Sequence, residues 1–299
     1  MMNNIILTVF TPAYNRAHTL PRTYESLCNQ TNKNFVWMII DDGSTDNTKE
    51  LVNEWQSVDN GFEIEYFYKK NGGMHTAHNK AYENIKTEIN VCIDSDDMMP
   101  VDAVDKILTF WEKYGSDTVA GIVALDADMS GKILGTELPK EITRTTTTKL
   151  YGKFGVTGDK KFIYRTDVIN SVPAYPEFDG EKLVPLGYKY NLVAQKYEML
   201  LMNEVVCLVD YQQDGSTNTI FKQYLQSPRG FAVANSVSMQ YSESFLDRIK
   251  SIVHYVAECR IAKDKKWLKN SPRKFVTTLL YPLGFAAEKY IRHVNRRSN

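Results

Sequence analysis

The chain has few cysteines, no long apolar run and no repetitive segment. Its four cysteines are far apart and form no CxxC pair, which argues against a structural zinc site or a disulfide framework and favours a reducing cytoplasm. No stretch approaches the roughly 18 apolar residues of a membrane span. The apolar run at residues 5–10 is too short for a signal peptide and lacks its basic flank. We therefore expect a protein that is neither exported nor inserted across a membrane.

Charge is balanced over the whole chain but not along it. The 36 Lys and Arg equal the 36 Asp and Glu in number. Eleven of the cations fall in residues 260–299, where Asp264 and Glu288 are the only acids, so this segment carries a net charge of +9 and the rest carries −9. The 43% hydrophobic content of the 299 residues is that of a globular protein with one main core and a C-terminal appendage.

Short apolar runs alternate with helical spacing over the first 125 residues. Strands are predicted at residues 5–10, 35–40, 63–68, 90–93 and 119–125, and helices around 20–27, 45–55, 76–85 and 102–114. Thr45 or Asp46 is expected to cap the second helix. The alternation favours a Rossmann-like, mostly parallel α/β sheet flanked by helices, in which ligands bind beyond the carboxyl ends of the strands.

Three carboxylates stand within four residues after the strand at 90–93, in the sequence Asp94-Ser95-Asp96-Asp97. Their mutual repulsion is costly unless a cation or solvent offsets it. Mg²⁺ and Mn²⁺ prefer oxygen ligands and commonly bridge one or two carboxylates to substrate phosphates, so the motif indicates a bound diphosphate. The alternative is that Asp96 and Asp97 only solvate a turn and cap the helix that follows Pro100.

Three further polar motifs follow predicted strands. Thr11-Pro-Ala-Tyr-Asn-Arg16 offers an aromatic ring for a base and a guanidinium for phosphate. In Asp41-Asp42-Gly-Ser44, a carboxylate can accept a hydrogen bond from a base N–H, although such a turn is also an ordinary helix start. The segment with Asn71, Gly72 and Asn79 combines flexible backbone with polar side chains near a helix start, which suits ribose or phosphate; a plain glycine turn is the alternative.

The order and spacing of these four motifs resemble glycosyltransferase family 2, the inverting enzymes of the GT-A fold, over residues 5–125. The resemblance implies that one pocket for the nucleoside is contacted or lined by Thr11, Pro12, Tyr14, Asn15, Arg16 and Asp42. It implies that Asp94 and Asp96 bind the metal, Mn²⁺ or Mg²⁺, and the donor diphosphate, with Ser95 in the same segment. Asp96 is the expected direct metal ligand.

A later segment, Phe178-Asp179-Gly-Glu181-Lys182, resembles the family motif in which a carboxylate at a helix start is the catalytic base. Glu181 is the candidate, and Asp179 and Asp159 are rivals. Many relatives have Glu-Asp where this chain has Glu-Lys, so a structural glutamate is the alternative interpretation. Residues 211–217, which include Asp214, also resemble a loop that borders the active site in capsule and cell-wall transferases of the family.

The resemblance implies an inverting transferase that moves a sugar from a UDP-sugar to a hydroxyl of a carbohydrate or lipid-linked saccharide acceptor, in the synthesis of surface polysaccharide or glycolipid. We expect a catalytic domain over residues 1–225, divided into a nucleotide-sugar part (1–125) and an acceptor part (126–225), and a helical segment at 226–299. A sugar nucleotidyltransferase and a non-catalytic nucleotide-sugar-binding protein are the rival functions.

The C-terminal segment mixes basic and apolar residues at helical spacing, interrupted by Pro282 and Gly284. Such a segment can lie in an anionic bilayer interface, which would place the enzyme at the inner face of the plasma membrane. The alternative is a helix hairpin packed on the domain with a solvated basic face. Because no nucleic-acid-binding module accompanies the charge, no nucleic-acid partner is expected.

Overall fold

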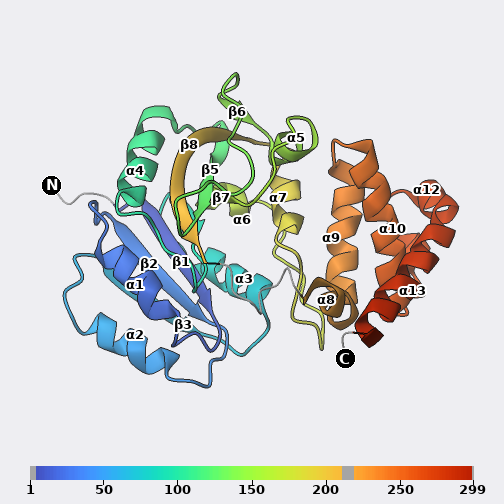
Figure 1. Ribbon diagram of the computed structural model, residues 1–299, viewed down its shortest axis with the longest axis horizontal. Coiled ribbons are helices and arrows are strands. Elements are labelled where there is room, and N and C mark those ends of the chain that lie inside the picture. Colours follow the sequence, from blue (N-terminus) through green and yellow to red (C-terminus); the bar gives the residue numbers. More distant parts are fainter. Residues whose placement is uncertain (1–4, 211–218, 298–299) are drawn as a thin grey trace. The chain divides into compact units, whose positions relative to one another are not determined.

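The computed structural model describes residues 5–210 and 219–297, which fall into two compact units (Figure 1). The sheet unit takes in the described residues through Thr146, together with Gly155–Pro173 and Tyr197–Asp210. The helical unit takes in Thr147–Phe154, Ala174–Lys196 and the described residues after Asp210. Segments of the middle third of the chain therefore pack alternately in the sheet unit and in the helical unit. The boundary expected near residue 225, between a catalytic domain and a helical segment, stays a prediction.

Within the described residues, eight strands form one mixed sheet in the order β3-β2-β1-β4-β7-β5-β8-β6. The strands are β1 (Leu7–Ala13), β2 (Phe35–Asp41), β3 (Glu63–Tyr68), β4 (Ile89–Cys92), β5 (Val119–Asp128), β6 (Arg144–Thr145), β7 (Lys160–Arg165) and β8 (Glu198–Val209). The first four pair in parallel, as does β5 with β8, whereas β7 and β6 run antiparallel to their neighbours. The mostly parallel α/β sheet predicted from the sequence is confirmed.

Helices cover both faces of this sheet. They are α1 (Leu20–Cys28), α2 (Thr48–Gln56), α3 (Met74–Asn84), α4 (Ala103–Tyr114) and α6 (Thr166–Asn170). Every residue of β1 is buried, which accounts for its mainly apolar sequence on both faces. Leu7 and Val9 join a core with residues of α1, α2 and α4, while the ring of Phe10 meets His78 and Tyr82 of α3 edge-on.

One detail of the second helix differs from the sequence-based expectation. The residue in the N-cap position of α2 is Asn47, not Thr45 or Asp46. The Asp46 carboxylate nevertheless accepts hydrogen bonds from the amide and the hydroxyl of Thr48, at 3.2 and 2.6 Å. Its other oxygen accepts from the amide of Ala17, at 3.0 Å. Asp46 therefore both supports the helix start and holds the loop after β1.

The helical unit consists of α5 (Thr147–Gly152), α7 (Gly187–Val193), α8 (Ile220–Gln226), α9 (Pro228–Tyr241), α10 (Phe245–Ile261), α11 (Trp267–Asn270), α12 (Lys274–Leu279) and α13 (Tyr281–Arg297). Its core is a separate apolar cluster on α9 and α10 that includes Met239, Ile252 and Val256. None of the helices among residues 5–210 and 219–297 is both long enough and apolar enough to cross a membrane.

Candidate active site

Four of the polar motifs meet at one edge of the sheet unit. They directly follow β1, β2, β3 and β4, which are adjacent and parallel, so the carboxyl ends of these strands lie together. The sheet topology thus brings together segments that are up to about eighty residues apart in the chain, which is the expected place for a ligand in an open α/β sheet.

The loops after β1 and β2 are joined through Asn15. Its amide donates to the hydroxyl of Ser44 at 2.9 Å, and its side-chain oxygen accepts from the amide of Thr45 at 2.7 Å. Asn15 adopts a φ of 53°, a left-handed conformation that asparagine tolerates better than most residues. The ring of Tyr14 is left 47% exposed beside this junction.

Thr11 and Pro12, which were expected to line the nucleoside pocket, are both buried in β1. The hydroxyl of Thr11 accepts a hydrogen bond from the indole N–H of Trp37, at 3.0 Å. The structure therefore gives Thr11 a role in the sheet, and the contact of both residues with a nucleoside stays a prediction.

Asp42 is 4% exposed and holds the turn after β3. Its carboxylate pairs with Lys69 at 2.5 Å and accepts from the amides of Gly72 and Gly73 at 2.9 and 2.7 Å. The side-chain amide of Asn71 donates to the Asp42 carbonyl at 2.8 Å, while its own Oδ1 is buried and has no hydrogen-bond partner among the described residues. The turn is therefore rigidly held, and it retains one buried acceptor.

Gly43 makes the approach of the two turns feasible. It has a φ of 84°, and a Cβ at this position would lie 2.7 Å from the backbone nitrogen of Asn71. Any other residue would be strained and would push the 71–73 turn away from Asp42. Asn79, expected at the same site, lies further along α3 and is partly exposed.

The four residues that follow Ile93 alternate in burial. Asp94 and Asp96 are partly exposed, whereas Ser95 and Asp97 are buried at 5% and 4%. Burial and then the neighbouring charge of Asp94 raise the pKa of Asp96, while Arg16 and Arg22 oppose this rise. Arg16 and Asp96, predicted independently from two motifs, are therefore electrostatic neighbours.

Asp97 turns away from this edge into the protein. Its carboxylate lies 3.8 Å from Lys161 Nζ on β7 and accepts from the thiol of Cys207 on β8 at 3.5 Å. The same lysine lies 3.9 Å from Asp126, and its side chain is only 12% exposed. Burial lowers the pKa of Lys161, but Asp126 and the other nearby acids raise it by more. The pKa of Lys161 is therefore raised, and the lysine stays charged. Asp97 does not cap α4, whose N-cap is Asp102.

Asp94 and Asp96 fit a hard divalent cation. They are two partly exposed carboxylates on alternate positions of one segment, and burial, followed by the charge of Asp94, raises the pKa of Asp96. The residues described contain no group of three or more His, Cys, Asp or Glu side chains arranged around a common metal position. Two protein carboxylates are enough for Mg²⁺ or Mn²⁺ when substrate phosphates and waters complete the coordination.

Glu181 lies in the helical unit, in a turn before α7 and not at a helix start as expected. Its side chain is 7% exposed and pairs with Arg229 at 2.7 Å. It also accepts from the amide of Gly230, in the first turn of α9, at 2.9 Å. Asp179 belongs to the same turn, and Asp159 belongs to the sheet unit. The loop at residues 211–217, with Asp214, lies outside the described residues.

Sequence reasoning missed two lysines of this region. Lys69 follows β3 at the same edge as the recognised motifs, so its position was a usable signal. Lys161 gave no such signal, because a lysine within a short strand is normally assigned to solvent and its partners Asp97 and Asp126 are distant in the chain.

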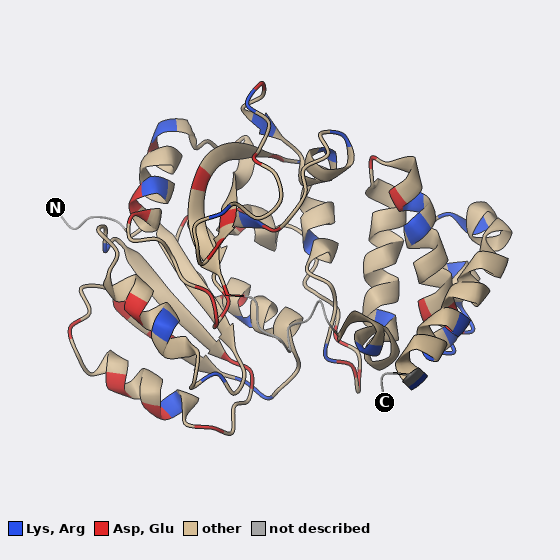
Figure 2. Ribbon diagram, in the orientation of Figure 1, with Lys and Arg blue, Asp and Glu red and all other residues tan. Residues whose placement is uncertain are grey.

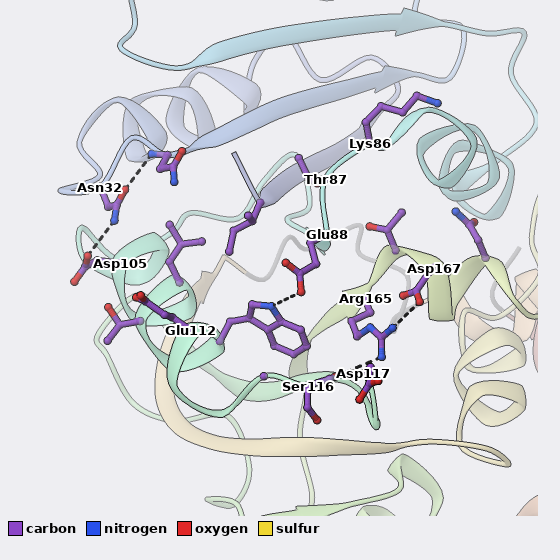
Figure 3. A pocket seen from close by; sticks show the side chains of 18 residues that line it. Asn32, Lys86, Thr87, Glu88, Asp105, Glu112, Ser116, Asp117, Arg165 and Asp167 are labelled. Atoms are coloured by element: carbon purple, nitrogen blue, oxygen red, sulfur yellow. Dashed lines mark hydrogen bonds and ion pairs between the residues drawn. The ribbon is translucent and has the colours of Figure 1, made fainter. Parts of the chain in front are cut away.

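A cavity of about 1140 Å³ lies at the opposite edge of the sheet unit (Figure 3). It is lined by Asn34 and Glu88, which precede β2 and β4, and by Arg165 at the end of antiparallel β7. Two pairs of its polar groups contact each other: Arg165 with Asp167 at 2.6 Å, and Glu88 with the indole of Trp111 at 3.0 Å. None of the predicted site residues lines it, so we assign the site to the carboxyl edge despite the size of this cavity.

Solved structures with a similar fold include proteins crystallised with nucleotides or nucleotide sugars. The crystal structure of S. aureus TarS in complex with UDP superposes with a TM-score of 0.59 at 15% identity, covering 98% of this chain and 92% of that one. A mannosyltransferase from Pyrobaculum calidifontis, in complex with GDP-Man and Mn²⁺, gives 0.57 at 16% identity, covering 96% and 74%. These similarities show the GT-A fold that the motifs predicted.

The sequence model of glycosyl transferase family 2 matches residues 8–172, more than half of the chain, and the protein belongs to this family. The teichuronic acid biosynthesis glycosyltransferase TuaG of Bacillus subtilis is 30% identical over 105 residues, which is 35% of this chain and 41% of that protein. Pasteurella multocida hyaluronan synthase is 26% identical over 296 residues, 93% of this chain and 29% of that one. The chain thus spans less than half the length of these curated relatives.

Proposed function

We propose that this protein transfers a sugar from a UDP-sugar to an acceptor hydroxyl, with inversion, in a reaction that depends on Mn²⁺ or Mg²⁺. The observation that carries the proposal is the partly exposed pair Asp94 and Asp96, placed at the carboxyl end of β4 beside Arg16. Family membership favours this function over a sugar nucleotidyltransferase. The UDP complex of TarS supports a uridine nucleotide, and the Mn²⁺ complex of the mannosyltransferase supports a divalent metal.

The donor would bind along the carboxyl edge of the sheet unit. The exposed ring of Tyr14 can stack on the base, and the buried orphan Oδ1 of Asn71 can accept from a base N–H or a ribose hydroxyl. The Gly72 and Gly73 backbone, held by Asp42, lets the nucleotide approach closely. Arg16 would pair with the diphosphate beside Asp94 and Asp96.

Bound at Asp94 and Asp96, the metal would stabilise the negative charge that develops on the departing diphosphate. The protein itself keeps these two carboxylates apart from Asp97, which is buried and lies 3.8 Å from Lys161. On the acceptor side, Glu181 would take the hydroxyl proton as the new C–O bond forms and the bond to the diphosphate breaks. Arg229 and Gly230 fix the direction of this carboxylate.

The acceptor we propose is a carbohydrate or a lipid-linked saccharide of a cell-surface polysaccharide or glycolipid. The names of TuaG and hyaluronan synthase support a polysaccharide pathway. Contact of the basic C-terminal helices with an anionic membrane belongs to the same proposal, since it would bring the enzyme to a lipid-linked acceptor.

UDP release from a panel of UDP-sugars, measured with Mn²⁺ and with EDTA, tests this function. We expect one donor to be hydrolysed slowly in the presence of metal, and the rate to fall about 100-fold in Asp96→Ala. Glu112→Gln, at an exposed position on the opposite edge of the sheet, is the matched control and should be unchanged. Release that is indifferent to both EDTA and Asp96→Ala would refute the metal site. Tight UDP binding without any release would indicate a non-catalytic binding protein.

A further inference from the structure

The last two helices expose a stripe of large apolar side chains. Phe275, Leu279 and Leu283 are 82%, 68% and 55% exposed, and Tyr290 is 60% exposed. With the exposed Ala286 they recur every three or four residues along α12 and α13, which is the spacing of one face within each of these two helices. We call these five residues the apolar stripe. Exposed apolar residues are common singly, but a row of them on one face marks an interaction surface.

The apolar stripe is not the side by which these helices pack on their own unit. That side carries Thr277, Gly284, Glu288 and Ile291, all of them buried. A Cβ on Gly284 would lie 2.4 Å from the Cβ of Val256, so α13 is pressed closely against α10 there. Because another face already supplies the packing, the fold of the helical unit does not account for the apolar stripe.

Charge around the apolar stripe is of one sign. Between residues 265 and 297 the only acid is Glu288, which is 5% exposed and pairs with Arg260 and Arg292, each at 2.8 Å. Lys274 and Lys289, next to stripe residues, are exposed, and so are Lys265, Lys266 and Lys269. Figure 2 shows Lys and Arg, in blue, recurring along these helices. The surface therefore combines exposed apolar groups with exposed cations.

We propose that α12 and α13 dock on an anionic lipid bilayer, with the apolar stripe entering the boundary between headgroups and acyl chains and the lysines contacting the headgroups. Amphipathic helices of this kind lie in the membrane plane, with the apolar face about 5–10 Å deep. Each exposed lysine adds attraction to anionic headgroups, and its long apolar stem can lie along the same boundary.

Two other occupants fit the surface less well. A second copy of the chain would bring two segments of net charge +9 together, which opposes self-association. A nucleic acid would satisfy the cations, and the rings of Phe275 and Tyr290 could stack on bases, but Leu279 and Leu283 would stay exposed to water. An anionic bilayer is the partner that satisfies the apolar and the cationic groups at once.

Co-sedimentation of the full-length protein with vesicles tests the proposal, and it needs no donor or acceptor. The protein should bind vesicles with about 30% phosphatidylglycerol and only weakly bind pure phosphatidylcholine, and salt should weaken the binding. The triple variant Phe275→Ser, Leu279→Ser and Leu283→Ser should lose roughly tenfold or more of the binding. A matched triple variant of exposed residues in the sheet unit, Val58→Ser, Val101→Ser and Tyr114→Ser, should bind like wild type.

Circular dichroism and light scattering on the same samples complete the test. An unchanged thermal transition in the stripe variant would attribute the lost binding to the surface and not to unfolding. The proposal is overturned if the stripe variant still binds anionic vesicles, if neutral vesicles bind equally well, or if the stripe variant only converts a dimer to a monomer. Competition by RNA without vesicle binding would also overturn it. Because UDP release is measured separately, failure of this proposal leaves the transferase test intact.

Discussion

The sheet unit and the helical unit both bury carboxylates, but the surroundings of these groups differ. In the sheet unit, Asp97 and Asp126 share Lys161 directly behind the exposed pair Asp94 and Asp96. In the helical unit, Glu288 pairs with two arginines and fastens α13 to α10. Burial and pairing of a carboxylate are therefore common to a site and to a plain helix contact.

What distinguishes the site is an acidic pair that forms no ion pair among the described residues, although Arg16 and Arg22 lie near enough to lower the pKa of Asp96. Asp94 and Asp96 follow β4 and stand beside Asp97, which lies near Lys161, and burial, with the charge of Asp94 next, raises the pKa of Asp96. A folded protein gains no stability from such an arrangement. Retaining it makes sense where a ligand supplies the missing positive charge.

Substituting the shared cation should give the largest effect. Lys161→Met removes the cation nearest to the buried Asp97 and Asp126, and we expect the free energy of unfolding to fall by about 3–5 kcal/mol at neutral pH. Arg260→Met in the helical unit leaves Glu288 paired with Arg292, so the free energy of unfolding should fall by only about 1 kcal/mol. Urea unfolding of both variants measures the contrast. Equal losses would show that Lys161 is no more important than an ordinary helix contact.

Glu258 lies on α10 and faces α9. Its titration should make the stability of the fold depend on pH in the opposite direction from that of an ordinary surface acid. Burial raises its pKa from 4.5 to about 7, with His254 and Asn235 opposing the rise. Between these two pH values the carboxyl group of Glu258 is protonated in the folded state and ionised in the unfolded state. Glu258 therefore makes the free energy of unfolding fall, by about 2–3 kcal/mol, as pH rises from about 4.5 to about 7, with no further fall above.

Glu258→Gln removes this titration, and the variant is expected to gain stability over wild type as pH rises through that window. The amide of Asn235, which donates to both carboxylate oxygens at 3.1 and 3.0 Å, can turn to accept from the new side chain. Unfolding in urea between pH 4.5 and pH 8 gives the difference curve. A difference that does not change with pH would contradict the assignment.

The smallest effect concerns the exposed acidic pair. Asp96→Asn removes one of two neighbouring charges, so it should stabilise the fold slightly, by about 0.5 kcal/mol, while donor turnover is lost. Thermal unfolding without metal, compared with Glu112→Gln, is the measurement. Destabilisation by Asp96→Asn would mean that the carboxylate is a structural group, as the acidic-turn interpretation holds.

The first 125 residues yielded to sequence reasoning because each strand there is a short apolar run followed by turn residues. The middle third did not. In β8 the pairing with β5 is interrupted by register shifts and Asn203 and Glu204 are exposed, so no alternation survives. In β7 the first two residues are lysines, and the acids that make Lys161 tolerable are brought to it only by the sheet. Such long-range compensation cannot be read from a local pattern.

The way the chain alternates between the two units bears on how this protein can be rearranged. The stretch Ala174–Lys196 packs with helices that come much later: Glu181 holds Arg229, and a Cβ on Gly230 would lie 1.9 Å from the carbonyl oxygen of Leu183. Cutting the chain after residue 225 would remove the partners of a segment that remains. The helices are therefore not a detachable module, and an exchange with another transferase would have to replace all three stretches of the helical unit together.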